Sequence, residues 1–204
     1  TGDGAGILFQ IPHEYFLAEC EGLGLALPEP FGYGVGMVFG PRDAELRGRC
    51  EQFLEESLDY YGLKPLGWRD VPVSSECLGK LARAAEPVIR QIFVVGLPEA
   101  DAASAPLRGA RNEGRERGHD TLATQEFERR LFLARKRAER FVSEKLGEKA
   151  EDFYIASLSC RTICYKGMFM AWQLFAYYPD LADEQVRSAL AIVHQRYSTN
   201  TFPN

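Results

Sequence analysis

The stretch TGDGAGILFQIP, residues 1–12, decides the fold class, because its three glycines lead directly into an apolar segment. The run ILFQI at 7–11 lies between a glycine and a proline, which is typical of a short buried strand. A phosphate-binding P-loop needs a lysine and a hydroxyl residue at fixed offsets before a helix, but TGDGAG has no lysine and precedes a strand-like run. GYGVGM at 32–37 fails as a dinucleotide fingerprint, because it is GxGxG rather than GxGxxG and also continues into a strand. Both glycine-rich stretches therefore predict turns and close backbone approach.

Outward from this stretch, helical and extended patterns alternate without the regular order of a doubly wound sheet. Asp43 is expected to cap a long helix that stops at Gly62, and Thr124 to cap a second long helix. Strands are predicted at 7–11, 34–40, 66–73, 89–96, 152–159 and 161–169, with a final apolar strand running toward His194. The pair 152–159 and 161–169 is predicted to form a hairpin. The mixed order favours an α+β layered fold.

Composition limits the class of protein. The 204 residues are 46% hydrophobic and 26% charged, with a formal net charge of −5, which is typical of a soluble globular protein with one sizeable domain or two small ones. A general affinity for nucleic acid would need a basic surface, and a membrane span about 18–20 apolar residues, so neither is expected. The three histidines show no ligand spacing, so no metal site is predicted.

The five cysteines are odd in number and scattered, which predicts reduced thiols and a cytoplasmic location. Cys160 and Cys164, close together in SLSCRTICYKG, are expected to be buried packing residues. His194 is expected to be a packed strand histidine. The basic run Arg135–Arg140 alternates with glutamates and predicts a salt-bridged exposed helix face.

Residues 97–120 differ in composition from the rest of the chain. Alanine, glycine, proline and charged residues dominate there, and bulky apolar residues are nearly absent. This composition predicts a flexible loop or insertion within one domain, because the flanking segments have the same mixed character.

A series of blocks resembles the glutamine amidotransferase domain of the glutamate synthase large subunit. They are TGDGAGILFQIP, YGVGMVF, LGWRDVPV, AAEPVIRQIFV, FERRLFLARKRAE, FYIASLSCRTICYKGM and HQRYSTNTFPN. The blocks follow the order of that family and cover nearly all of residues 1–204. The resemblance implies one type 2 glutamine amidotransferase domain with a four-layer αββα sandwich of the N-terminal-nucleophile hydrolase type, incomplete at both ends.

The resemblance also implies which chemical groups are present. In that family TGDGAG is internal and the nucleophile is an N-terminal cysteine, so Thr1 is not expected to be catalytic and Asp3 is expected to be structural. The Asn-Gly segment of the oxyanion hole follows later in the family than FPN. We therefore expect no catalytic residue in these 204 residues, and no turnover of L-glutamine by them alone.

The segment HQRYSTNT is predicted to bind the substrate glutamine. An α-carboxylate needs a planar, permanently charged partner, and Arg196 offers two parallel N–H donors. The resemblance implies that Arg196 binds this carboxylate with Thr199 nearby. Tyr197 is a candidate pocket wall, Ser198 a hydroxyl donor and Asn200 a further contact.

The resemblance extends to the rest of the enzyme. It implies that L-glutamine is hydrolysed to glutamate and ammonia, and that the ammonia and 2-oxoglutarate form a second glutamate. No cofactor is expected within these 204 residues. FMN and an iron–sulfur cluster are expected in the full-length enzyme, with a small subunit or ferredoxin as electron donor. The remaining domains of the same large subunit are the expected partners, in the cytoplasm or in a plastid.

Two other hypotheses remain open from the sequence. One is a non-catalytic binding or interaction module related to the amidotransferases. The other is a hydrolase whose nucleophile is Thr1, activated by its own α-amine.

Overall fold

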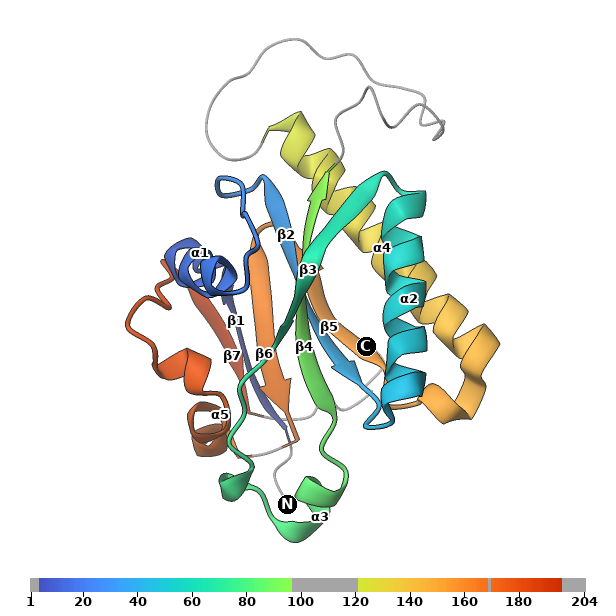
Figure 1. The fold of residues 1–204 in the computed structure, drawn as a ribbon. Helices are drawn as coiled ribbons and strands as arrows, with labels where there is room; N and C mark the ends of the chain where they lie inside the picture. Colours follow the sequence, from blue (N-terminus) through green and yellow to red (C-terminus); the bar gives the residue numbers. More distant parts are fainter. Residues whose placement is uncertain (1–3, 97–120, 169, 196–204) are drawn as a thin grey trace, which may run out of the picture.

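The computed structural model describes residues 4–96, 121–168 and 170–195, which form seven strands and five α-helices (Figure 1). The strands are β1 Ala5–Gln10, β2 Tyr33–Gly40, β3 Leu63–Asp70, β4 Val88–Gly96, β5 Tyr154–Ser159, β6 Thr162–Gly167 and β7 Ala191–His194. The α-helices are α1 His13–Gly22, α2 Ala44–Tyr60, α3 Lys80–Ala84, α4 Leu122–Leu146 and α5 Ala171–Tyr177. Short 3-10 helices span Ser75–Cys77, Gly147–Ala150 and Pro179–Ala182. The predicted loop at 97–120 lies outside the described residues.

The strands form two sheets in which every pairing is antiparallel. The smaller sheet has the order β6-β1-β7, and the larger has the order β3-β4-β2-β5. The strand that follows the opening glycines is thus the centre of the smaller sheet. Mixed helices and antiparallel sheets confirm the predicted α+β class.

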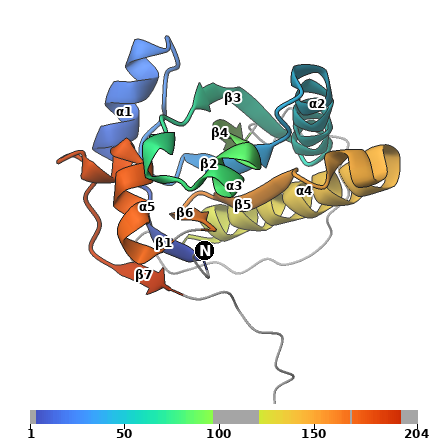
Figure 2. The ribbon, with the colours of Figure 1, turned by 90° about the horizontal axis from the view of Figure 1, so that it is seen from below.

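One face of the larger sheet packs against α2 and α4, which lie side by side along it (Figure 2). The core between them is apolar and fully enclosed, with Leu54 and Leu58 from α2 and Leu131 and Ala138 from α4. Ile92 on β4 meets them from the sheet. Leu54 and Leu58 are four residues apart and Leu131 and Ala138 seven, so each pair lies on one face of its helix.

A second core joins the other face of the larger sheet to the smaller sheet, α1 and α5. Val35 and Phe93 of the larger sheet share it with Phe9 of β1, Phe16 of α1 and Leu174 of α5. Phe16 meets Phe93 edge to face, with ring centroids 5.4 Å apart. Each sheet therefore has a buried face in this core.

The helix ends follow local chemistry. The Asp43 side chain accepts a hydrogen bond of 2.8 Å from the Leu46 amide, and Gly62 after α2 has a φ of +67°, as predicted. The cap of α4 was placed wrongly. Its N-cap is Thr121, whose hydroxyl accepts from the amide of Thr124 at 3.1 Å. Both threonines suit a cap, and the helix begins at the earlier one.

The predicted hairpin of β5 and β6 is wrong. β5 pairs with β2 and β6 pairs with β1, so the chain crosses from one sheet to the other between Ser159 and Thr162. The Ser159 hydroxyl accepts from the amides of Arg161 and Thr162, at 3.0 and 3.2 Å, and holds this crossing. A short polar connection is compatible with a hairpin or with a crossing, so the pattern alone did not separate them.

The two neighbouring cysteines lie on different elements. Cys160 is buried at the crossing, as predicted, and its thiol donates to Glu128 of α4 at 3.1 Å. Cys164 lies in β6 and is only half-buried, so the prediction holds for one of the two.

The charged face of α4 is confirmed. Arg135 and Lys136 both pair with Glu139, at 2.8 Å each, and Arg140 pairs with Glu144 at 2.8 Å. Arg137, in the same run, instead lies over the ring of Tyr60.

Candidate functional site

β7 leads the chain toward the predicted substrate-binding residues. Five such residues were predicted, and all lie outside the described residues: Arg196, Tyr197, Ser198, Thr199 and Asn200. β7 runs antiparallel to β1, with Ala191 opposite Phe9 and His194 opposite Gly6. The described chain therefore leaves the smaller sheet at the Gly6 end of β1.

Gly6 on β1 lies close to side chains of both neighbouring strands. A Cβ atom at Gly6 would lie 2.8 Å from Cβ of Lys166 on β6 and would also meet the imidazole of His194 on β7. The chain enters β1 through Gly4, whose φ of +97° is a conformation that glycine adopts readily. The predicted tight turn spans TGDGAG, and Thr1 and Asp3 lie outside the described residues, so the turn stays a prediction.

His194 is exposed, although a packed strand histidine was predicted. All four residues of β7 are exposed, including Ile192 and Val193 in the apolar run. The prediction is wrong because it assumed that an apolar run is buried. In the described part of the structure no element covers β7. His194 lies over Gly6, where the absence of a side chain leaves room for its ring.

A buried polar network, which sequence reasoning missed, joins the two sheets. Its centre is Arg69 on β3, only 4% exposed. Arg69 donates to Asp180 from both terminal nitrogens, at 2.9 Å to Oδ2 and 3.1 Å to Oδ1. Asp180, in the 3-10 helix after α5, is 3% exposed. A second carboxylate, Glu19 of α1, accepts from Arg69 at 2.6 Å. Arg69 is therefore a buried cation with two carboxylate partners.

Tyr165 and Gln91 close this network into a ring. The Tyr165 hydroxyl donates to Asp180 at 2.8 Å and accepts from the Gln91 amide at 2.8 Å. Gln91 in turn accepts from Arg69 at 2.9 Å. β6 of the smaller sheet is thereby tied to β3 and β4 of the larger one. We call Arg69, Gln91, Tyr165 and Asp180 the Arg69 ring.

The ring changes the proton affinity of its members. Burial alone would lower the pKa of Arg69, but the hydrogen bond and charge of Asp180 raise it above its ordinary value. Burial and the Asp180 carboxylate raise the pKa of Tyr165 well above its ordinary value. Arg69 is thus held charged and Tyr165 neutral, so the ring has a fixed pattern of donors. The signal that could have indicated the Arg69 ring in the sequence was Arg69 itself, a charged residue inside the extended run LGWRDVPV.

The thiols of all five cysteines have a raised pKa. All are free thiols, and burial is the main cause that raises the pKa of each. The pKa is raised to about 11 for Cys20 and Cys50, and to about 12 for Cys160, where a neighbouring carboxylate adds to burial. A catalytic cysteine needs the opposite shift.

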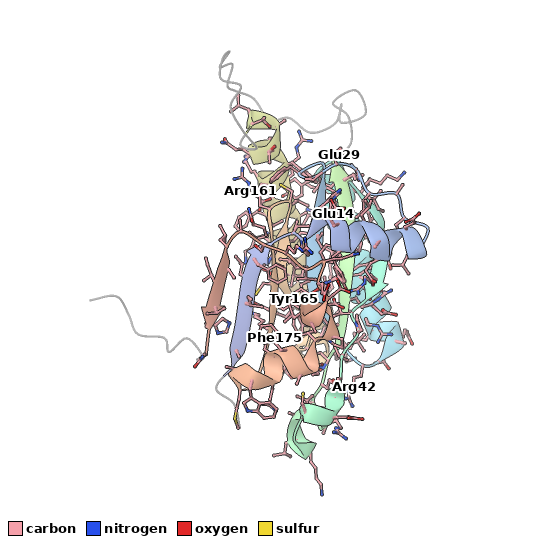
Figure 3. All side chains as sticks on the ribbon, turned by 90° about the vertical axis from the view of Figure 1, so that its left-hand side faces the viewer. Glu14, Glu29, Arg42, Arg161, Tyr165 and Phe175 are labelled. Carbon is pink, nitrogen blue, oxygen red and sulfur yellow. The ribbon has the colours of Figure 1, made fainter. Side chains whose placement is uncertain are left out.

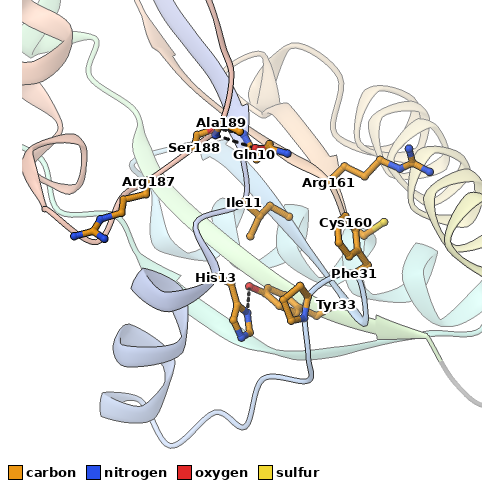
Figure 4. A pocket seen from close by; sticks show the side chains of 11 residues that line it. Gln10, Ile11, His13, Phe31, Tyr33, Cys160, Arg161, Arg187, Ser188 and Ala189 are labelled. Atoms are coloured by element: carbon orange, nitrogen blue, oxygen red, sulfur yellow. Dashed lines mark hydrogen bonds between the residues drawn. The ribbon is translucent and has the colours of Figure 1, made fainter. Parts of the chain in front are cut away.

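A cavity of about 350 Å³ lies at the other end of β1 (Figure 4). It is lined by residues of β1, α1, the crossing and the segment before β7: Gln10, Ile11, His13, Pro30, Phe31, Tyr33, Cys160, Arg161, Arg187, Ser188 and Ala189. His13 Nδ1 lies 3.2 Å from the Tyr33 hydroxyl on its wall. Figure 4 shows the guanidinium groups of Arg161 and Arg187 directed away from its middle. The cavity is therefore separate from the end at which β7 leaves the sheet.

The described residues form neither a metal-binding group nor a membrane-spanning helix. Among residues 4–96, 121–168 and 170–195, no three His, Cys, Asp or Glu side chains are grouped so that they could hold a metal ion. Within the same ranges, no helix combines the length and apolar character needed to cross a membrane.

Comparison with known proteins gives a match over the whole chain. The family model described as "Glutamine amidotransferases class-II" matches residues 1–204. The chain is 42% identical over 204 residues to the glutamate synthase [NADPH] large chain of Bacillus subtilis, and 40% identical over 206 residues to that of Azospirillum brasilense. A ferredoxin-dependent glutamate synthase of Synechocystis is 37% identical over 203 residues. Each comparison covers the whole of this chain.

This chain corresponds to only a small part of each relative's length. The chain spans 12% of the length of the two large chains and 11% of the Synechocystis relative. Six of the seven blocks singled out in the sequence fall on β1, β2, β3, β4, α4, β5 and β6, whereas HQRYSTNTFPN begins at the end of β7 and continues outside the described residues. On the family match over residues 1–204, the chain belongs to the class-II glutamine amidotransferases.

Proposed function

We propose that this chain is part of the glutamine amidotransferase domain of a glutamate synthase. The domain hydrolyses L-glutamine with water to glutamate and ammonia. The observation that carries this proposal is the family match over residues 1–204, together with relatives that are themselves glutamate synthases. Residues 1–204 belong to one glutamine amidotransferase domain.

The domain has the four-layer αββα architecture of the N-terminal-nucleophile hydrolases. Two packed sheets with α2 and α4 on one side, and α1 and α5 sharing the core on the other, support this assignment. The Arg69 ring is the polar connection between the layers.

Arg196 pairs with the α-carboxylate of glutamine through two parallel N–H donors. Thr199 and Ser198 supply hydroxyl donors beside it, Tyr197 forms a wall of the pocket and Asn200 a further contact. The support for this arrangement is the course of β7, whose last residue, His194, lies opposite Gly6 on β1, the central strand of the smaller sheet.

The nucleophile is a cysteine contributed from outside these 204 residues. The raised pKa of every cysteine in the chain supports this, because each is held as the neutral thiol. Oxyanion donors from an Asn-Gly segment complete the site.

The ammonia reacts with 2-oxoglutarate in another part of the same polypeptide, and a two-electron reduction of the resulting imine gives glutamate. FMN and an iron–sulfur cluster supply those electrons from the rest of the enzyme. We place both groups in the remaining part of the large subunit, because the relatives are glutamate synthases of which this chain spans only 11–12%. A small subunit or ferredoxin is the electron donor, and the enzyme works in the cytoplasm or in a plastid.

The test is Arg196→Ala in the full-length protein, with glutamine hydrolysis measured at varied substrate concentration. Loss of a charged hydrogen-bond partner should raise KM for glutamine roughly 10- to 100-fold. Arg187→Ala is the matched control, because Arg187 is exposed before β7 and donates to the Glu184 carbonyl at 2.9 Å. An unchanged KM in Arg196→Ala, or no glutamine hydrolysis by the wild-type protein, would refute the proposal.

A further inference from the structure

β7 is held more firmly at its start than at its end. Just before the strand, the Gln10 side chain accepts from the Ala189 amide at 3.0 Å, and the Gln10 amide donates to the Ser188 hydroxyl at 3.1 Å. The strand Ala191–His194 is exposed along its whole length, and within the described residues it pairs with β1 alone. The position of its far end therefore depends on the pairing with β1 and on the contacts of His194 itself.

His194 lies over the only glycine of β1. Gly6 pairs with Lys166 of β6 on one side and with His194 of β7 on the other. Side chains of directly opposite residues in an antiparallel pair lie on the same face of the sheet. A Cβ atom at Gly6 would lie 2.8 Å from Cβ of Lys166 and would also meet the His194 imidazole. We call these three residues the Gly6 seat, and its space is already filled by the two neighbours.

The two neighbours of Gly6 differ in how far they can move. Lys166 follows Tyr165, whose hydroxyl bonds to Asp180 and Gln91 within the Arg69 ring, at 2.8 Å each. The Lys166 carbonyl also accepts from the Tyr178 hydroxyl at 2.8 Å. Figure 3 shows Tyr165 inside the molecule and β7, in red, at its edge. β6 is therefore fixed by buried hydrogen bonds, and β7 is the strand that yields when the seat is overfilled.

We infer that Gly6 and His194 are positioning residues for the substrate glutamine, because the imidazole seated over Gly6 fixes the end of β7 from which the chain continues to Arg196. This inference rests on the proposed function, in which Arg196 binds the α-carboxylate. Arg196 follows His194 by two residues, a span of at most about 7 Å of extended chain. So short a span leaves little chain to absorb a shift of the strand end. A displacement of about 1 Å in an active site can cost roughly 100-fold in rate.

The Gly6 seat also accounts for two features of the sequence. A glycine inside an apolar strand loses packing and usually marks a close approach of neighbouring groups. A histidine ends the apolar run of β7, where the ring finds room over that glycine. Neither residue is assigned a contact with glutamine, and each acts through the position of Arg196.

The first test is His194→Ala in the full-length protein, with glutamine hydrolysis measured at varied substrate concentration. We expect KM for glutamine to rise several-fold and kcat to change less, because a carboxylate contact acts in the ground state and in the transition state alike. The matched control is Ile192→Ala, on the same face of β7, 65% exposed and opposite Leu8. An unchanged KM in His194→Ala, or an equal rise in Ile192→Ala, overturns the inference.

The second test fills the seat from the other side. Gly6→Ala should raise KM for glutamine roughly 10-fold, because the new methyl group displaces the ring and the end of β7 with it. The matched control is Gly34→Ala on β2, whose Cβ would lie 2.8 Å from Leu131 of α4 and so overfills the larger sheet instead. We expect both variants to unfold at lower denaturant concentration and only Gly6→Ala to change KM. A rise in both, or in neither, overturns the inference, and if Gly6→Ala does not fold the first test decides.

The double variant Gly6→Ala, His194→Ala tests whether the two residues act together. No ring remains to be displaced, so its KM should be no higher than that of His194→Ala alone. Sites that act independently instead have effects that multiply. A KM equal to the product of the two single effects overturns the inference. Absence of glutamine hydrolysis by the wild-type protein, or an unchanged KM in Arg196→Ala, refutes the proposed function itself.

Discussion

α4 and α5 distribute polar and apolar groups in opposite ways. α4 buries an apolar stripe and turns paired charges to the outside, as Arg135–Glu139 and Arg140–Glu144 show. α5 turns Trp172 and Phe175 to the outside, while the carboxylate that follows it, Asp180, is buried. The α4 side has the composition of a surface that meets water. The α5 side has the composition of a surface that meets protein.

The energetic consequences of charge also differ between the two sides. Exposed pairs on a helix contribute little, because water solvates each partner almost as well. A buried pair that loses one partner leaves the other charge without solvation. The same residue types therefore have small effects near α4 and large effects near α5.

The largest expected effect is Asp180→Ala. Arg69 would keep Glu19 as a partner but lose its bidentate carboxylate, and the Tyr165 hydroxyl would lose its acceptor. We expect the free energy of unfolding to fall by about 3–5 kcal/mol. Chemical denaturation of the purified protein measures this change.

Glu144→Ala on α4 is the matched control. It also removes a carboxylate from an arginine, at 2.8 Å, but the pair is exposed. We expect a loss of about 0.2–1 kcal/mol. Losses of equal size in the two variants would contradict the contrast between the two sides.

The second expected effect concerns two glycines, one on each side. Gly6→Ala places a Cβ against Lys166 and His194, and the overpacking should cost about 1–3 kcal/mol. Gly48→Ala in α2 has no atom within 4 Å of the new Cβ. It should stabilise the protein by about 0.5–1 kcal/mol, because alanine favours the helix. Chemical denaturation of both variants gives the sign of each change in the free energy of unfolding. A change of the same sign in both variants would contradict this prediction.

The last expected effect arises only above neutral pH and is a pH dependence at Cys160, whose thiol and amide donate to Glu128 of α4. The pKa of Cys160 is raised to about 12 beside Glu128, so the folded state binds the thiol proton more tightly than the unfolded state. The stabilisation is complete below the unfolded pKa of about 8.5 and is lost as pH rises toward 12, by at most about 1.4 kcal/mol per pH unit. Cys160→Ser keeps a donor to Glu128 without an ionisation in this range. Its unfolding free energy should fall less steeply between pH 9 and 11, and identical slopes would rule out this role of the thiol.

Local patterns predicted much of the fold. The strand after TGDGAG, the helix capped by Asp43 and the charged face of α4 all depend on neighbours within a few residues. The family resemblance was likewise carried by contiguous blocks, and the family match confirms it. The cap of α4 was missed by three residues because Thr121 and Thr124 are chemically equivalent candidates.

The errors have a common physical cause. The partners of β5 and β6 depend on which sheet each strand joins, and a short polar connection does not reveal that. The apolar pattern of β7 indicates a strand that can be buried, but only its neighbours decide whether it is covered. The predicted binding residues from Arg196 to Asn200 lie outside the described residues and stay a prediction.

The sequence by itself determined the local elements, the α+β class and the family, because each of these depends on short-range periodicity or on contiguous motifs. Only the tertiary structure decided that Arg69 meets Asp180, 111 residues later, and that α5 exposes Trp172 and Phe175 while the carboxylate after it is buried. The physical reason is that pairing across such a separation depends on how whole layers pack. A residue's type sets the interactions that it can make, and the packing of the sheets decides which of them it makes.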